Sequence, residues 1–473
     1  MIVDEKWPVA RLIPISSASG IEAQERRAAS ALLAVMSAVP EFGRALLKPL
    51  GAPAGKVQTF IEVPFRIDGK SIRPDGVIAV ARGGKTWGAI VEAKTAGASL
   101  DPQQIDAYLD LARELEFHAV LSISNQYVTS STEYPIEVDR RKLRKVRLHH
   151  WSWIDVLTEA TLQKQYRGVS DPDQAYILQE LIRYLSDPRS GAVAFDSMGP
   201  GWTTVRENAR TQTLRKQDPE VAAVAARWDD LVRYLALDLT KDLGRDVKQV
   251  LSRAERAPGA RRHALIESLA NSGQLEAELQ VPDAAGPLNI VADLRSRQVI
   301  VSTKLDAPRE GRAKGRVSWL LRQLSNAPDG VTVEARVPYS AASLGARLSA
   351  VRESPDLLYP DGGREIREFR LSLSGNMGLK RDSGRGSFVE SVIATTKDFY
   401  SAVLQNLRPW KAAPPKLPQA AEEAVEVEAL PEPLQEAVTA AESEMDKAAG
   451  EADGGESDNE LPTAGRGLTQ VPD

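Results

Sequence analysis

The chain has 473 residues, of which 42% are hydrophobic and 26% are charged, and its formal net charge is −5. It contains no cysteine, which excludes disulfides, zinc–thiolate sites and thiol catalysis, and its four histidines argue against a multi-histidine metal site. No apolar run approaches the ~20 residues that cross a bilayer, and no signal-peptide pattern opens the chain, so we expect a cytoplasmic protein without a membrane partner.

A chain of this length exceeds one ordinary hydrophobic core, so we expect two or three domains, the first over residues 1–190. This domain starts with a helix over 20–48, whose apolar residues recur at helical spacing up to a break near Pro40. The remaining pattern predicts a helix over 102–115, one more helix at the end, and strands over 57–65, 76–81, 86–94, 119–124 and 146–153. This order indicates an α/β fold with a mixed central sheet flanked by helices.

Three further parts are expected after the first domain. Residues 191–272 read as a helical linker segment, with helix from 219 to 269. Residues 273–412 read as an α+β accessory domain of unknown role, with helices near 317–324 and 387–407 and strands at 275–281, 288–294, 298–305, 331–337 and 367–373. Residues 413–473 are rich in Pro, Ala and Glu and lack aromatic residues, so we expect a disordered acidic tail.

The net charge is unevenly distributed along the chain. Residues 419–473 hold 15 acidic and two basic residues, a net of −13, so residues 1–418 carry +8. A mildly basic body permits a polyanionic partner but does not require one.

Two acids and a lysine form the most informative pattern in the chain. Glu92 and Lys94 are two residues apart in an apolar strand, so they share one face of it. Asp75 follows Pro74 at the start of the strand 76–81. If 76–81 pairs antiparallel with 90–94 across a Gly-Gly turn, Asp75 lies beside Glu92 and Lys94. Two carboxylates can then bind Mg²⁺, and the lysine can orient or deprotonate an attacking water.

This pattern resembles the PD-(D/E)XK nuclease superfamily, which has the restriction-endonuclease-like fold, here as Pro74-Asp75 and Glu92-Ala93-Lys94. The resemblance covers about residues 20–160. It implies that Asp75 and Glu92 bind the divalent cation and that Lys94 assists the water nucleophile. Gln104 and Tyr108 resemble the Q-x-x-x-Y element of the RecB-type and phage-exonuclease-type branches. Their i, i+4 spacing places them on one helix face, where they are expected to position a phosphate or a water.

Many members of the superfamily also carry an acid on the first core helix. Glu25 lies on the same helix stripe as Ala28 and Leu32, so it faces inward, which is unusual for a carboxylate. Glu25 is therefore the expected third metal or water ligand, and Glu22, one turn earlier, is the weaker candidate.

Ordinary structural explanations stand beside these interpretations. Asp75 can be a turn former, and Glu92 with Lys94 can be a surface ion pair. Gln104 can be a solvated side chain, Tyr108 a half-buried one, and Glu25 can lie on a solvated helix face. Glu62 is a further acid that we place on the solvent face of its strand. The basic run 139–147 fits either a nucleic-acid contact or an edge strand protected by charge, and the second is favoured.

These observations predict a nuclease that uses Mg²⁺ or Mn²⁺ to hydrolyse phosphodiester bonds in nucleic acid, with DNA favoured over RNA as the partner. Two alternatives stay open. The first is a catalytically silent nuclease-fold binding or scaffold protein. The second is a nuclease gated by a ligand that the accessory region senses, as in defence or stress systems. Strandedness, endo or exo cleavage and assembly into a homo-oligomer are not determined by the sequence.

Overall fold

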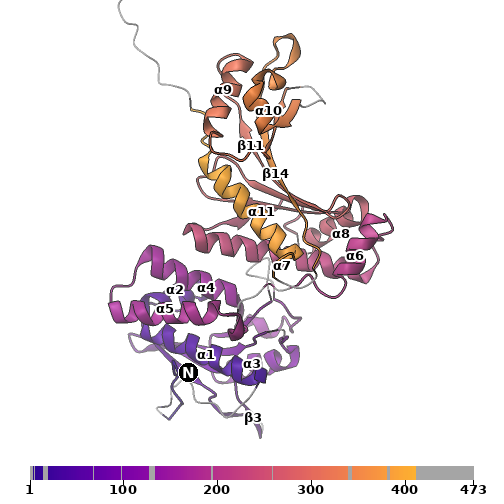
Figure 1. Ribbon diagram of the computed structural model, residues 1–473. Coiled ribbons are helices and arrows are strands. Elements are labelled where there is room, and N and C mark those ends of the chain that lie inside the picture. The colour runs from indigo at the N-terminus through magenta and orange to yellow at the C-terminus, as the bar shows by residue number, and fades with distance from the viewer. Residues whose placement is uncertain are drawn as a thin grey trace, which may run out of the picture. The chain divides into compact units, whose positions relative to one another are not determined.

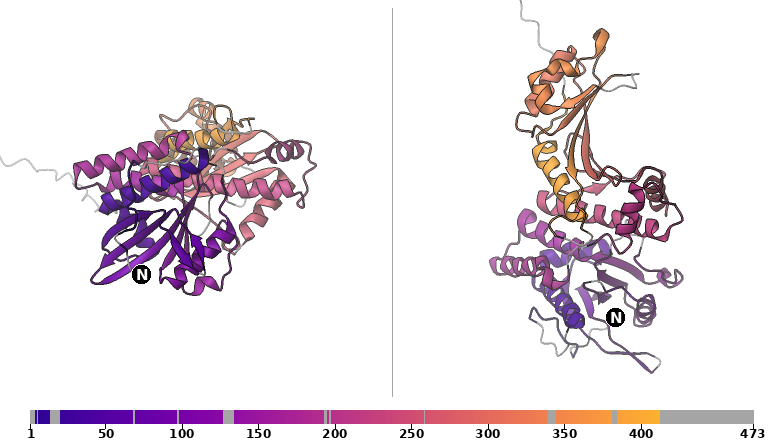
Figure 2. Two further views of the ribbon diagram at one scale, coloured as in Figure 1. Left: turned by 90° about the horizontal axis from the view of Figure 1, so that it is seen from below. Right: turned by 45° about the vertical axis from the view of Figure 1, so that its right-hand side comes forward.

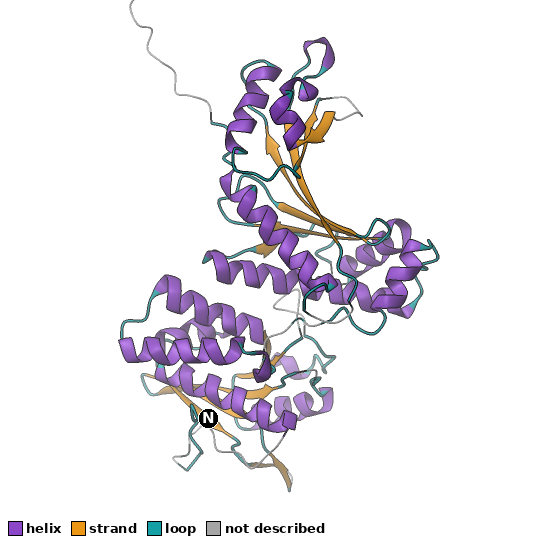
Figure 3. Cartoon of the chain, viewed as in Figure 1, coloured by secondary structure: helices purple, strands orange, loops and turns teal. Residues whose placement is uncertain are grey.

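The computed structural model describes residues 4–411, apart from 5, 14–19, 68, 97, 127–133, 193–194, 196, 258, 339–343 and 381–383. The chain divides into two compact units, Met1–Lys411 and Ala412–Asp473, and the second lies wholly outside the described residues. The expected disorder of 413–473 therefore also falls outside them. About 44% of the described residues are helix and 22% are strand, so the expected mixed α/β class is confirmed (Figure 3).

The N-terminal part is built around a five-stranded mixed sheet in the order β1-β4-β5-β6-β7. Its strands are β1 (Lys56–Ile61), β4 (Gly76–Arg82), β5 (Lys85–Ala93), β6 (Ala119–Ser124) and β7 (Arg147–Ser152). The pairs β1–β4 and β4–β5 are antiparallel, whereas β5–β6 and β6–β7 are parallel. The expected strand 57–65 ends at Ile61, and a separate hairpin of β2 (Phe65–Ile67) and β3 (Lys70–Ile72) follows it.

Helices cover both faces of this sheet (Figures 1 and 2). One face packs against α1 (Gly20–Ala38), α2 (Pro40–Leu47), α4 (Trp153–Leu162) and α5 (Pro172–Ser186), and its core includes Val91 and Ala93. The other face packs against α3 (Pro102–Glu114) through Ile90, Ile105 and Tyr108. Short helical turns are η1 (Lys48–Leu50), η2 (Lys142–Arg144), η3 (Gln163–Arg167) and η4 (Pro188–Ser190).

The predicted helix 20–48 is two helices that meet at a bend of 110°. Pro40 causes the break, because proline disfavours helical backbone in the residue before it and fits well as the first residue of a new helix. Within the described part of the chain no single helix is long and apolar enough to cross a membrane; α1 and the segment Pro40–Leu50 meet the length and composition criteria only as a bent pair.

The following part contains a seven-stranded antiparallel sheet in the order β13-β12-β14-β11-β10-β9-β8. Its strands are β8 (Lys248–Gln249), β9 (Gln274–Gln280), β10 (Leu288–Asp293), β11 (Gln298–Asp306), β12 (Thr332–Arg336), β13 (Leu344–Arg347) and β14 (Glu368–Asn376). Its helices are α6 (Trp202–Arg210), α7 (Pro219–Leu243), α8 (Ala260–Ser272), α9 (Ala313–Gln323), α10 (Leu348–Glu353) and α11 (Phe388–Ala402), with short turns η5 (Pro355–Leu358), η6 (Asp361–Gly363) and η7 (Leu404–Asn406). Figure 1 shows α11 lying along β11 and β14.

Two features of this part differ from expectation. The predicted helix 219–269 ends at Leu243, because Gly244 takes a left-handed conformation (φ 65°) and closes α7. The short strand β8 then precedes α8. The second difference is that residues of the expected linker 191–272, such as Trp228, share one hydrophobic core with the sheet that follows.

Candidate active site

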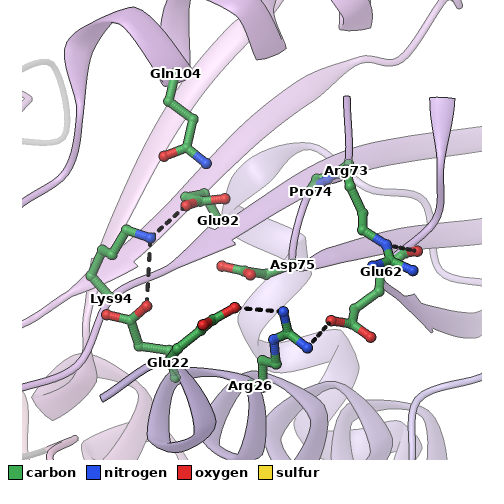
Figure 4. A pocket seen from close by; sticks show the side chains of 10 residues that line it. Glu22, Arg26, Glu62, Arg73, Pro74, Asp75, Glu92, Lys94 and Gln104 are labelled. Carbon is green, nitrogen blue, oxygen red and sulfur yellow. Dashed lines mark hydrogen bonds and ion pairs between the residues drawn. The ribbon is translucent and has the colours of Figure 1, made fainter. Parts of the chain in front are cut away.

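A pocket of about 310 Å³ lies at the end of β5 in the N-terminal part (Figure 4). Its walls come from α1, the turn after β1, the segment before β4, the end of β5 and the first turn of α3. The lining residues are Glu22, Glu25, Arg26, Glu62, Arg73, Pro74, Asp75, Glu92, Lys94 and Gln104. Of the residues predicted for the site, all but Tyr108 line it.

The β4–β5 hairpin positions the two central acids. Gly76 pairs with Val91, so Asp75, just before Gly76, lies opposite the end of β5, as expected from the Gly83-Gly84 turn. The backbone N–H of Ala93 donates to Asp75 Oδ2 at 2.8 Å. This hydrogen bond joins the start of one strand to the end of the next and fixes the Asp75 carboxylate next to Glu92.

Lys94 lies between two carboxylates. Its Nζ is 2.8 Å from Glu92 Oε1 and 3.5 Å from Glu25 Oε2. Glu92 is 2% exposed and Glu25 is 9% exposed, which confirms that the helix stripe carrying Glu25 faces inward. Burial lowers the pKa of Lys94, but the hydrogen bond to Glu92 and the charges of Glu92, Asp75 and Glu25 outweigh this and raise it overall. Lys94 is therefore protonated at neutral pH, which favours its orienting role over deprotonation of water.

The backbone of Lys94 is held on both sides. Its N–H donates to the carbonyl of Ile123 on β6, and its carbonyl accepts a hydrogen bond from Trp153 Nε1 at 2.8 Å. Trp153 is the first residue of α4 and is fully buried. Strand β5 thus ends at a position that β6 and α4 define.

Gln104 and Tyr108 form a hydrogen-bonded chain that ends on Glu92. Gln104 Nε2 donates to the Tyr108 hydroxyl at 2.8 Å, and that hydroxyl donates to Glu92 Oε2 at 2.9 Å. Tyr108 is 2% exposed, and burial followed by the charge of Glu92 raises its pKa. Tyr108 therefore orients Glu92 from behind, and of the two only Gln104 borders the open pocket.

Asp75 is the central acid of the pocket that has no ion-pair partner among the described residues. Burial, and then the charge of Glu92, raise the pKa of Asp75 to about 7, against the lowering effects of the Ala93 N–H and of the Lys94 charge. The pocket as a whole contains five acidic and three basic side chains, so its net charge is −2 when all five acids are ionised.

The donor set fits a hard divalent cation in charge and chemistry. Carboxylate oxygens are the ligands that Mg²⁺ and Mn²⁺ prefer, and an excess of two negative charges matches one such ion. The three predicted ligands Asp75, Glu92 and Glu25 all reach the pocket. They do not form a preassembled cluster, since Lys94 is paired with two of them, and within the described residues no group of three His, Cys, Asp or Glu has the arrangement of a metal site.

Three pocket residues were not recognised as site residues from the sequence. The structure contradicts the placement of Glu62 on the solvent face of a strand: Glu62 follows β1 with φ 50°, and its side chain pairs with Arg26 at 3.0 Å. Arg26 also pairs with Glu22 at 2.6 Å, one helical turn away. Arg73 could have been recognised as a site residue from the sequence, because it stands directly before Pro74-Asp75.

The basic run 139–147 does not line the pocket and is not itself an edge strand. Residues 142–144 form η2, which packs on α3, and only Arg147 belongs to the edge strand β7. Lys142 is paired with Asp110 at 2.8 Å and with Asp106 at 3.6 Å. The residues that are exposed and form no ion pair with a described carboxylate are Arg140, Arg144, Lys145 and Arg147.

Comparison with known proteins gives no relative for this chain. No family model, no curated protein and no solved structure matches it.

Proposed function

We propose that this protein is a nuclease of the restriction-endonuclease-like fold that uses Mg²⁺ or Mn²⁺ to hydrolyse phosphodiester bonds. The observation that carries the proposal is the arrangement of Asp75, Glu92 and Lys94 at the end of one hairpin, with Asp75 lacking a cationic partner. The mixed central sheet flanked by helices supports it, because the sequence resemblance implies a fold of this kind.

Asp75 and Glu92 would hold the cation, with Glu25 beside them. A divalent cation in such a site polarises the phosphoryl group and lowers the pKa of water. Lys94 Nζ carries protons that can orient the attacking water and stabilise negative charge on a phosphoryl oxygen. Tyr108 holds Glu92 in place, and Gln104 presents its amide to the pocket. A bound cation would also offset the negative charge of the carboxylates, which would otherwise repel an anionic substrate.

Nucleic acid is the proposed substrate class because the N-terminal part carries basic side chains as well as the acids of the pocket. Arg73 lines the pocket, and exposed basic side chains precede and begin β7. Such side chains neutralise phosphates along a polynucleotide.

The direct test is incubation with labelled single-stranded DNA, double-stranded DNA and RNA in Mg²⁺, Mn²⁺ or EDTA. We expect cleavage of at least one substrate that EDTA stops and that Asp75→Asn removes. Cleavage that persists in EDTA or in Asp75→Asn contradicts the assignment of the cation site. The three substrates also test the expected preference for DNA.

A second candidate is a catalytically silent nuclease-fold binding protein. The ion pairs of Lys94 with Glu92 and Glu25 favour it, since they balance part of the charge of these two acids without a metal ion. Calorimetry with Mn²⁺ separates the two candidates. Heat of binding that Glu92→Ala abolishes supports the nuclease, and absence of binding by the wild type supports the silent protein.

A further inference from the structure

Arg73 is held at the pocket wall by the segment that also carries Asp75. Its Nε donates to the carbonyl of Glu62 at 3.1 Å, while the N–H of Glu62 donates to the carbonyl of Asp75. Pro74, directly after Arg73, restricts the backbone on its other side. The guanidinium has five N–H groups, so the bond to Glu62 leaves four for a ligand.

Arg73 differs from the other two cations of the pocket. Lys94 is paired with Glu92 and Glu25, and Arg26 is paired with Glu22 and Glu62. Among the described residues no carboxylate forms an ion pair with Arg73, although its side chain is exposed at a pocket rich in acids. An arginine with an anchored stem and a free planar fork is suited to bidentate binding of a phosphate.

Arg73 lies on the opposite side of Asp75 from Lys94, away from the place proposed for the cleaved phosphate (Figure 4). Figure 4 shows Asp75 between Lys94 on one side and Arg73 on the other. A phosphate placed at Asp75, Glu92 and Lys94 is therefore approached by Arg73 from the opposite wall. In a polynucleotide, the next phosphate along the strand can occupy that wall, whereas an isolated phosphodiester has no such group.

We propose that Arg73 binds a phosphate that neighbours the cleaved one, so that the site selects polynucleotides over isolated phosphodiesters. The inference rests on the proposed function for the identity of the cleaved bond. Arg73 is a specificity-determining residue in this scheme, and its removal weakens substrate binding more than it slows the chemical step.

The test compares Arg73→Gln and Arg73→Lys with a matched control, Arg82→Gln. Arg82 is an exposed arginine at the other end of β4, outside the pocket. The substrates are a labelled oligonucleotide and bis(p-nitrophenyl) phosphate, a diester with no neighbouring phosphate. Arg73→Gln should lower kcat/KM on the oligonucleotide about tenfold, mainly through KM, and lower it far less on the small diester. Arg73→Lys should recover part of the loss, and Arg82→Gln should behave as the wild type.

Equal losses on the two substrates would overturn the proposal, because they would place Arg73 on the cleaved phosphate or in a structural role. Unchanged kinetics on both would overturn it by making Arg73 a solvated side chain. If the wild type cleaves neither substrate, the proposed function fails, and oligonucleotide binding followed by fluorescence anisotropy decides about Arg73. A salt dependence whose slope falls by about 1 in Arg73→Gln then supports the phosphate contact, and an unchanged slope rejects it.

Discussion

Charged side chains are enclosed both in the N-terminal region, around the sheet of β1 and β4–β7, and in the C-terminal region, around the sheet of β8–β14. Two enclosed charges of the C-terminal region have ion-pair partners, whereas Asp75 of the N-terminal region has none among the described residues. In the C-terminal region Asp238 is 6% exposed and is paired with Lys241 at 2.6 Å and Lys397 at 2.5 Å. Burial raises the pKa of Asp238, but these two lysines outweigh it and lower the pKa overall. Asp75 in the N-terminal pocket has no such partner, and its pKa rises to about 7.

Arg316 shows the same compensation in the C-terminal region. It is 3% exposed and is paired with Glu365 at 3.2 Å, and its guanidinium donates to the carbonyls of Ile366 at 2.6 Å and Arg309 at 2.9 Å. The difference between the regions teaches that burial alone does not indicate a functional charge. A charge that the fold encloses and leaves unbalanced is the one that requires a ligand.

The largest effect expected from this comparison is on activity. Lys94→Ala should lower cleavage about a thousandfold or more, because it removes the protonated amine beside the reacting group. The fold should be retained, which circular dichroism and binding of an oligonucleotide can check. Full cleavage by this variant in buffer with Mg²⁺ would falsify the assignment of Lys94.

Arg316→Ala should have the opposite profile. It removes a buried guanidinium that satisfies two carbonyls, so the free energy of unfolding should fall by about 3 kcal/mol. Activity per folded molecule should stay at the wild-type level. Chemical denaturation and a cleavage assay on the same preparation check both statements, and a variant that is stable but inactive would contradict the comparison.

The third prediction uses the pKa of Asp75. This pKa is about 7 in the folded protein against an ordinary 3.8, so folding tightens the binding of the proton. Protonation of Asp75 therefore stabilises the folded protein, and this stabilisation is fully present below pH 3.8. It is lost as the pH rises through about 7, with a slope in the free energy of unfolding of at most ~1.4 kcal/mol per pH unit. Denaturation in EDTA should show this loss in the wild type and not in Asp75→Asn. If both proteins show the same pH dependence, Asp75 is not the group responsible.

The smallest effects are expected for Tyr108→Phe and Gln104→Ala, in that order. Tyr108→Phe keeps the buried ring and removes the hydroxyl that donates to Glu92, so the affinity for Mn²⁺ should fall about tenfold. Gln104→Ala leaves the bond between Tyr108 and Glu92 intact and should change Mn²⁺ affinity less. Calorimetry on the two variants gives the order, and a larger loss in Gln104→Ala would mean that Gln104 contacts the cation site directly.

Local patterns were sufficient to predict the centre of the site and its sheet. An apolar run predicted β5, the alternation of side chains along a strand predicted the shared face of Glu92 and Lys94, and two glycines predicted the hairpin that brings Asp75 beside them. The inward position of Glu25 followed from helical spacing. Each of these inferences depends on residues that are close in the sequence.

Features that depend on distant residues or unusual backbone were not predictable in the same way. Glu62 enters the pocket because its backbone leaves the strand with a positive φ. Residues other than glycine rarely adopt a positive φ, so the sequence does not predict it at a glutamate. The role of Tyr108 as a support for Glu92 depends on how α3 packs over β5. The strand β13 pairs with β12 and is short and half-exposed, so its sequence lacks a strong strand pattern.

The end of β5 also has a consequence for how the chain folds. Side chains alternate along a strand, so a slip of one residue in the pairing of β5 would move Glu92 and Lys94 to the side of α1 and α4. That layer is apolar around Val91 and Ala93, so burying an acid and an amine among these side chains would be costly. The same two residues that are proposed to act on substrate therefore make every neighbouring register of the strand unfavourable. Replacing them with alanine should leave the native register in place but reduce the energy gap that protects it during folding.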